Sequence, residues 1–355
     1  MQSGVCYTVL IHMAHQSLYR AYRPASFKEV LGQEEVIGPL TEQLAAKKLG
    51  HAYLFAGSRG LGKTSVARIF ARELGCDERD VYEIDAASHN GVDYIRELSE
   101  NVYTLPFASP CKVYILDEAH MLSKSSWNAF LKTLEEPPAH AIFILATTEL
   151  DKVPETVRSR CQVFTFKKPS RVGLAKLVAM VAKKEGYALE ASAADLVALL
   201  ADGSYRDALS VLEKVLSVSQ DKKLTREEVS KATGAPKAES VHAFVTGLAH
   251  GKADVALAAV TQAAGDGLDM NLYLSLVIDA VRQVLLVRFA PELRKEIAAE
   301  LGADAYADIE ALAKAAETKL SHNTLRVLLE AAARARYTPV PSLPLELAVF
   351  ELVPN

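Results

Sequence analysis

Residues 57 to 64 read Gly-Ser-Arg-Gly-Leu-Gly-Lys-Thr, which fits the phosphate-binding loop pattern G-x-x-x-x-G-K-[ST] at every fixed position. In such a loop, glycines let backbone N–H groups turn toward phosphate oxygens, and the helix that follows adds a partial positive charge at its N-terminus. Lys63 would reach the β- and γ-phosphates, and Thr64 would hold a magnesium ion. The pattern therefore predicts a site for a nucleoside triphosphate, formed by Gly57, Ser58, Arg59, Gly60, Leu61, Gly62, Lys63, Thr64 and Ser65.

Two carboxylates follow a second apolar run. Residues 113–116 are Val-Tyr-Ile-Leu, and Asp117 and Glu118 come directly after them. The C-terminal end of a buried parallel strand is where ligands sit in open sheets. Asp117 is suited to be a direct or an outer ligand of the magnesium ion, and Glu118 can polarise the water that attacks the γ-phosphate. The phosphate loop and this acidic pair together predict nucleotide hydrolysis.

The elements that must position these residues alternate in type. Short apolar segments that predict strands are separated by helical patterns between residues 18 and 168, and they cover residues 51–56, 81–85, 112–116, 141–146 and 162–166. This alternation is typical of a three-layer α/β fold with a parallel sheet. We therefore expect an α/β P-loop domain over residues 18–168.

The remainder of the chain reads as helical. Helical periodicity continues through residues 169–234, with breaks at Gly186, at Gly203-Ser204 and at residues 219–224, and predicts a small helical bundle. Gly234-Ala235-Pro236 opens an alanine- and leucine-rich region, residues 235–355, that predicts a further all-helical domain. Residues 1–17 are expected to form a disordered extension, and Met13 is an alternative true start of the protein.

Composition narrows the class of protein. The chain has 355 residues, half of them apolar, and a net charge of −4, which argues against a protein coated in positive charge. No stretch of about 18 uninterrupted apolar residues predicts a membrane-spanning helix. None of the four cysteines forms a C-x-x-C pair; they are Cys6, Cys76, Cys111 and Cys161. Their spacing therefore predicts neither a zinc site nor a disulfide framework, which fits a cytoplasmic location.

Further motifs carry a resemblance. The chain resembles the AAA+ ATPases, and within them the family of gamma/tau subunits of bacterial DNA polymerase III, which belong to the clamp loaders. The resemblance rests on the N-terminal Leu18-Tyr19-Arg20-Ala21-Tyr22-Arg23-Pro24 with Phe27, Val30, Gly32 and Gln33, on Glu83-Ile84-Asp85-Ala86-Ala87-Ser88, on Leu131-Lys132-Thr133-Leu134-Glu135-Glu136-Pro137-Pro138, on Ala146-Thr147-Thr148 and on Ser159-Arg160-Cys161.

The resemblance implies roles for particular residues. ATP would be bound with Mg²⁺ held by Thr64 and Asp117, and the adenine and ribose would be bordered by Tyr22, Arg23, Val30 and Gln33. Thr148 would be the polar sensor that orients the attacking water. Arg206 would be the second sensor, an arginine of the helical lid that touches the γ-phosphate. Residues 169–234 would then be the lid, and residues 235–355 the oligomerising collar.

Arg160 is implied to act in trans, as the arginine finger that enters the nucleotide site of a neighbouring subunit. A guanidinium offers two parallel hydrogen bonds to phosphate oxygens and stabilises the charge that develops in phosphoryl transfer. The implied function is that of an ATPase motor that loads the sliding clamp onto primer-template DNA during replication. Its implied partners are the other clamp-loader subunits, in a pentameric hetero-oligomer, together with the clamp and the DNA.

The chain departs from the family pattern in two places. The family inserts a four-cysteine zinc module after the first helix of the ATPase domain, but here Cys76 stands alone and Asp77-Glu78-Arg79-Asp80 leads directly to the next strand. Zinc binding is therefore predicted to be absent. The long C-terminal extension of the tau form is also missing, which puts direct contacts with the polymerase and the helicase in doubt.

Parts of the sequence also fit three other functions. Asp117-Glu118-Ala119-His120 also fits the DEAH label of helicases, but these need two ATPase lobes, and the chain has one phosphate loop. A Holliday-junction branch-migration ATPase would share the loop and the lid, but would end in a winged helix. A scaffold subunit that binds ATP without turnover would need none of Lys63, Thr64, Asp117, Glu118 and Arg160.

Overall fold

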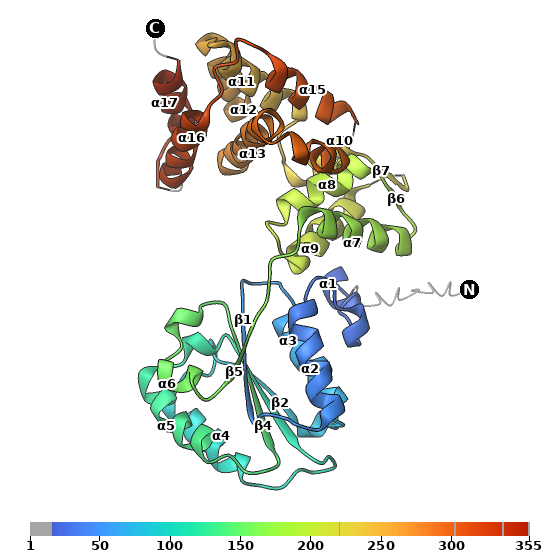
Figure 1. The fold of residues 1–355 in the computed structure, drawn as a ribbon, viewed down its shortest axis with the longest axis vertical. Helices are drawn as coiled ribbons and strands as arrows, with labels where there is room; N and C mark the ends of the chain where they lie inside the picture. The colour runs from blue at the N-terminus through green and yellow to red at the C-terminus, as the bar shows by residue number, and fades with distance from the viewer. Residues whose placement is uncertain (1–15, 220, 302, 336, 354–355) are drawn as a thin grey trace, which may run out of the picture. The chain divides into compact units, whose positions relative to one another are not determined.

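The computed structural model describes residues 16–219, 221–301, 303–335 and 337–353, so residues 1–15 of the expected N-terminal extension lie outside the described residues. The chain divides into two compact units (Figure 1). The first, which we call the sheet unit, comprises Met1–Gly173 and Ala201–Glu213. The second, the helical unit, comprises Leu174–Leu200 and Lys214–Asn355. These two units do not coincide with the three domains predicted for residues 18–168, 169–234 and 235–355. The predicted domain boundaries stay predictions.

The sheet unit contains five parallel strands in the order β2-β3-β4-β1-β5. Each predicted strand is present with its ends within one residue, and this confirms the predicted α/β class. The strands are β1 (Ala52–Ala56), β2 (Val81–Asp85), β3 (Lys112–Asp117), β4 (Ala141–Thr147) and β5 (Gln162–Thr165). β1 and β4 are buried along their whole length, because they lie inside the sheet and are covered on both faces.

Helices cover both faces of this sheet (Figure 1). On one face, Val36 and Leu40 of α2 and Phe70 of α3 pack with Phe55 and Ile144 of the strands. On the other, apolar side chains of α4, α5 and α6 pack against Leu116 and Leu145. The helices of the sheet unit are α1 (Leu18–Ala21), α2 (Glu34–Ala46), α3 (Lys63–Glu73), α4 (Val92–Val102), α5 (Lys124–Glu135) and α6 (Glu155–Arg158).

The local sequence explains where these helices lie. The buried residues of α4 are Ile95, Leu98 and Val102, which recur with the spacing of one helical face. α5 begins after Ser123, whose hydroxyl accepts a hydrogen bond from the Ser126 N–H at 3.1 Å and satisfies one of the free donors of the first turn. The sole tryptophan of the chain, Trp127 of α5, is buried in this face of the sheet and can report on the integrity of the unit.

The helical unit is built around α13, whose buried side chains include Tyr273, Val277 and Val281. Asp269 caps α13 by accepting from the N–H groups of Asn271 and Leu272. The helices that follow the sheet are α7 (Arg171–Lys184), α8 (Ala191–Leu200), α9 (Tyr205–Val218), α10 (Arg226–Thr233), α11 (Ala238–His250), α12 (Ala253–Gly265), α13 (Met270–Phe289), α14 (Arg294–Leu301), α15 (Ala303–Lys314), α16 (His322–Ala335) and α17 (Leu343–Leu352).

One part of the helical unit differs from the predicted all-helical pattern. β6 (Ala188–Leu189) and β7 (Lys223–Leu224) form a parallel pair of two-residue strands. Segments this short show no alternation of apolar and polar residues, so periodicity cannot detect them. The pair brings the residues after α7 beside the residues before α10.

α13 is long and apolar enough to cross a membrane by length and composition alone. Most of the relevant window is buried among other helices of the unit, and Asp279, Arg282 and Gln283 lie within it. Arg282 forms an ion pair with Asp279 at 3.6 Å. These features are those of the core helix of a globular domain.

Candidate nucleotide site

The carboxyl ends of the central strands meet at one edge of the sheet. The register pairs Asp85 of β2 with Asp117 of β3, and Ala56 of β1 with Thr147 of β4. The phosphate loop follows β1 directly, so the parallel strands deliver both predicted motifs to the same edge. This is the position at which ligands bind in open α/β sheets.

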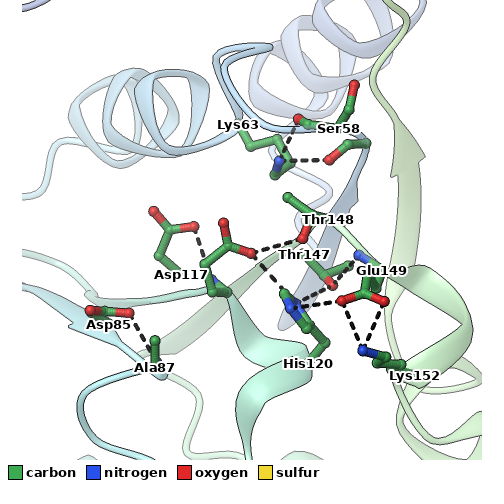
Figure 2. Close-up of polar contacts among 12 residues, drawn as sticks. Ser58, Lys63, Asp85, Ala87, Asp117, His120, Thr147, Thr148, Glu149 and Lys152 are labelled. Atoms are coloured by element: carbon green, nitrogen blue, oxygen red, sulfur yellow. Dashed lines mark hydrogen bonds and ion pairs between the residues drawn. The ribbon is translucent and has the colours of Figure 1, made fainter. Parts of the chain in front are cut away.

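The lysine of the phosphate loop is hydrogen-bonded to the backbone of the loop itself. The Lys63 ammonium donates hydrogen bonds to the backbone oxygens of Gly57 at 2.7 Å and Ser58 at 2.9 Å (Figure 2). Lys63 is only 6% exposed. Burial lowers the pKa of Lys63, while the carboxylates of Glu118 and Asp117 act in the opposite direction. A buried ammonium bound only to neutral carbonyl groups is suited to accept an anionic phosphate as a further partner.

Thr64 and Asp117 lie together, as a shared magnesium site requires. The Thr64 hydroxyl donates to Asp117 Oδ2 at 2.8 Å, and the other carboxylate oxygen accepts the N–H of Glu118 at 3.0 Å. Hydroxyl and carboxylate oxygens are hard ligands of the kind that Mg²⁺ prefers. The two residues therefore fit the ion, with Thr64 from the start of α3 and Asp117 from the end of β3.

Glu118 has a left-handed backbone, with φ of 48°, which is uncommon for a residue other than glycine. Its carboxylate accepts a hydrogen bond from the Thr148 hydroxyl at 3.1 Å, so the structure brings together the predicted base and the predicted sensor. Strained backbone of this kind occurs at active sites where the surrounding structure fixes it. Glu118 is half-buried, and the oxygen that accepts this bond is Oε2.

His120 joins two carboxylates next to the site, a link that the sequence analysis missed. Its Nδ1 lies 3.5 Å from Glu118 Oε2, and its Nε2 lies 3.4 Å from Glu149 Oε1. Thr147 completes the cluster, because its hydroxyl is 3.1 Å from His120 Nδ1 and accepts from the Glu149 N–H at 3.0 Å (Figure 2). The sequence analysis gives roles to Asp117 and Glu118, but His120 enters it only through the DEAH label of helicases, and no sequence signal links His120 to residues of the next strand.

The returning segment of the sheet unit contacts the phosphate loop. Tyr205 N–H donates to the Gly60 oxygen at 3.1 Å, and the Tyr205 hydroxyl donates to the Leu31 oxygen at 2.6 Å. Arg206 follows, and its guanidinium carbon lies 5.3 Å from the ring centroid of Tyr19. Arg206 is close enough to Lys63 to oppose the charged form of that lysine. The predicted second sensor is thus placed beside the loop by its own neighbours.

Gly60 cannot be replaced without disturbing this contact. Its φ is 76°, and a Cβ atom there would meet the Ser204 hydroxyl at 2.0 Å. Gly75, at the end of α3, has a φ of 78° but open space around it. We expect Gly75→Ala to cost roughly 1–2 kcal/mol of stability through backbone strain alone, and Gly60→Ala to cost more because of the added clash.

Urea unfolding followed by Trp127 fluorescence compares the two glycine variants within the sheet unit. Nucleotide is omitted, so that altered binding does not enter the comparison. Equal losses of stability in both variants would show that Ser204 moves aside and that the contact is loose.

The predicted adenine and ribose residues lie on the N-terminal segment of the sheet unit. Gln33 is buried, and its amide donates to the Lys167 oxygen at 2.8 Å and accepts from the Lys167 N–H at 3.1 Å. This pairing ties the segment to the end of the sheet, a structural task that the sequence did not indicate.

Val30 packs on the apolar cluster beneath α2, and Tyr22 and Arg23 are half-buried. Burial lowers the pKa of Arg23, and the nearby Arg68 acts in the same direction. Nucleotide contacts of these residues stay predictions.

Arg160 lies just after α6, with contacts apart from the phosphate loop. Its guanidinium pairs with Glu135 Oε1 at 2.6 Å and donates to the Thr156 oxygen, also at 2.6 Å. The side chain is 35% exposed. Both partners belong to the segments that carry α5 and α6, so the side chain is oriented by its own subunit while remaining accessible to another molecule.

The described cysteines do not form a zinc site. Cys76 and Cys111 lie side by side, while Cys161 is in another cluster, and Cys6 falls outside the described residues. Among the residues that the structure describes, no group of three or more His, Cys, Asp or Glu side chains is arranged to hold a metal ion. The predicted absence of zinc remains a prediction.

Comparison with solved structures bears on the fold. The Holliday junction branch migration motor RuvB of Thermotoga maritima matches 87% of this chain and 98% of its own, with a TM-score of 0.53 and 19% sequence identity. At this identity the likeness concerns the fold alone. The parallel sheet, the phosphate loop after β1 and the acidic pair after β3 define an AAA+ P-loop ATPase fold.

Sequence comparison then gives the family. The model for the DNA polymerase III delta subunit matches residues 32–91 and 80–170, and that for domain III of the DNA polymerase III gamma and tau subunits matches residues 224–354. The tau subunit of Bacillus subtilis is 40% identical over 302 residues, which are 79% of this chain and 54% of that subunit. The gamma subunit of Buchnera aphidicola is 38% identical over 254 residues, covering 66% of this chain and 69% of that protein.

The chain belongs to the gamma/tau family of bacterial DNA polymerase III subunits. It spans about half the length of the first relatives that it matches.

Proposed function

We propose that this chain is the ATPase motor subunit of a clamp loader, which binds and hydrolyses ATP to place a sliding clamp on primer-template DNA. The observation that carries the proposal is the constellation of Lys63, Thr64, Asp117, Glu118 and Thr148 at one sheet edge. Membership of the gamma/tau family supports the choice of reaction, since those relatives are named as DNA polymerase III subunits. A cytoplasmic location follows from a role in replication.

Each residue of the proposed site has its own role in ATP binding or hydrolysis. The loop from Gly57 to Ser65 binds the phosphates, and Lys63 moves from loop carbonyls to phosphate oxygens. Glu118 polarises the attacking water, and Thr148 fixes the carboxylate that does so. Arg206 contacts the γ-phosphate, and Tyr22, Arg23, Val30 and Gln33 border the base and sugar. Mg²⁺, held by Thr64 and Asp117, would supply charge neutralisation between the β- and γ-phosphates.

The proposed assembly follows from Arg160. An accessible guanidinium oriented by Glu135 is suited to enter the site of a neighbouring subunit. Residues 18–168 would form the ATPase domain, residues 169–234 the lid, and residues 235–355 the collar that holds subunits in a pentamer. Direct contacts with polymerase and helicase are not part of the proposal, because the chain spans only part of the tau relatives.

The alternative functions have less support. A Holliday-junction branch-migration ATPase is favoured only by a likeness of fold, whereas the C-terminal third matches the gamma and tau model. A scaffold subunit without turnover does not require the Thr148–Glu118 contact, which serves the attacking water. The mass of the complex with clamp and ATP separates a pentameric loader from a hexameric motor.

The test of the proposal is ATP turnover in the assembled system. The chain alone should hydrolyse ATP slowly, and the rate should rise when the other loader subunits, the clamp and primed DNA are present. Lys63→Ala should abolish both rates and weaken ATP binding, because the phosphates lose their buried counter-charge. A rate that is unaffected by clamp and primed DNA would contradict the clamp-loading function.

A further inference from the structure

Two thiols meet at the end of the sheet unit away from the phosphate loop. Cys76 Sγ lies 2.8 Å from Cys111 Sγ and 3.2 Å from the Cys111 oxygen, and both cysteines are free. Cys76 follows the C-terminal end of α3, and Cys111 immediately precedes β3. The pair therefore joins the far ends of the two elements whose near ends carry Lys63 and Asp117.

The surrounding backbone holds the two thiols in place. The Cys76 N–H donates to the Ala71 oxygen at 3.1 Å, and the next N–H, that of Asp77, donates to the Ser109 hydroxyl at 2.6 Å. Asp80 is buried and accepts the N–H groups of Phe107, Ala108 and Ser109 between 2.6 and 2.9 Å. These bonds fix the loop that carries Cys111 against the segment that carries Cys76.

We propose that Cys76 and Cys111 form a dithiol modification site that closes reversibly to an intramolecular disulfide on exposure to a peroxide. Closure requires the sulfur atoms to approach by less than about 1 Å from their present separation. Neither cysteine is among the residues of the proposed nucleotide site, so the proposal does not depend on the proposed function.

The two thiols have different parts in the reaction. The hydrogen bond from Cys76 lowers the pKa of Cys111, and the same bond raises the pKa of Cys76. Cys111 is therefore the nucleophile, and it is the more exposed of the two. Its thiol releases a proton, and the thiolate attacks one peroxide oxygen and breaks the O–O bond. The products are a sulfenic acid and hydroxide, and the hydroxide takes up the released proton as water. Cys76 then attacks that sulfur and loses its proton, and a second water leaves as the disulfide forms.

Cys111 is half-buried, and a cavity of about 390 Å³ on the edge of the sheet unit reaches the other member of the pair, Cys76. Cys76 is part of its lining, together with Arg23, Arg68 and Arg72. Glu78 and Glu83 also line it, and Glu83 pairs with Arg68 at 2.6 Å. The cavity is large enough for small oxidants and for a small reducing thiol. Reduction by such a thiol restores the free pair by thiol–disulfide exchange.

The test uses the full chain treated with a modest excess of hydrogen peroxide. Thiol titration should fall from four groups to two, and a non-reducing peptide map should show a Cys76–Cys111 cross-link that a reductant removes. The cross-link closes a loop of more than 30 residues in the unfolded chain, so the thermal midpoint followed by Trp127 fluorescence should rise by roughly 5–10 °C.

Matched variants separate this pair from the other cysteines. Cys111→Ser should retain its three thiols after treatment and show no rise in the thermal midpoint. Cys161→Ser and Cys6→Ser should each lose two thiols and show the same rise in the midpoint as the parent chain. Burial raises the pKa of Cys161 to about 12, which makes it a poor nucleophile and a suitable control. Loss of two thiols in Cys111→Ser, a cross-link between other cysteines, or an unchanged thiol count in the parent would each overturn the proposal.

Discussion

Arg160→Ala is expected to lower the stimulated rate of ATP hydrolysis by roughly 10³- to 10⁵-fold, the range known for arginine fingers. The reason is that a fixed guanidinium compensates the charge that spreads over the γ-phosphate oxygens in the transition state. The stability of the chain should hardly change, because the ion pair with Glu135 is partly exposed and such pairs contribute little. Phosphate release and the unfolding midpoint are the two measurements.

The action in trans can be tested by mixing two inactive variants. Arg160→Ala retains its phosphate loop, and Lys63→Ala retains its finger. If the finger serves a neighbour, a complete site forms wherever an Arg160→Ala subunit, with its intact loop, receives the finger of a Lys63→Ala subunit. In an equal mixture this arrangement occurs at about a quarter of all sites. A finger that serves its own subunit would leave the mixture as inactive as its components. Glu135→Gln is the matched control, because it removes the orienting partner and keeps the guanidinium.

Glu118→Gln is expected to lower turnover by roughly 10²- to 10⁴-fold, the usual contribution of a general base. ATP binding should remain, since the amide oxygen can still accept the Thr148 hydroxyl and since Lys63, Thr64 and Asp117 are unchanged. The measurements are phosphate release and titration with a fluorescent ATP analogue.

Glu149→Gln is the matched control for Glu118→Gln, because Glu149 contacts the same histidine from the other side but does not contact Thr148 through its carboxylate. It should retain most of the rate. Full turnover in Glu118→Gln would remove this residue from its role. A greater loss in Glu149→Gln would transfer that role to Glu149.

Local patterns in the sequence predicted the strands and the two motifs well. β1 and β4 are apolar runs buried on both faces, and such runs are recognisable without any knowledge of their neighbours. The order of the strands was not predictable in the same way, because it depends on which runs pair in space. The contact of Thr64 with Asp117 follows from that order and spans 53 residues of sequence.

Residues that act through distant partners escaped prediction. Gln33 is predicted to border the nucleotide, and its amide also pairs with the backbone of Lys167, a contact that only the folded chain brings about. His120 bridges Glu118 to a residue after the next strand. Cys76 and Cys111 are 35 residues apart and lack the close spacing by which paired cysteines are recognised.

The sheet unit is not one stretch of chain, and this limits how it can be dissected. The backbone leaves the unit after Gly173 and returns from Ala201 to Glu213, bringing back Ser204, Tyr205 and Arg206. A fragment cut at Gly173 would retain every residue of the phosphate loop but lose the hydrogen bond to the Gly60 oxygen. Such a fragment would test an altered loop, so weak nucleotide binding by it would carry no information about the intact chain. A fragment that preserves the sheet unit has to reach Glu213, and it then also includes Leu174–Leu200 of the helical unit, with most of α7 and all of α8.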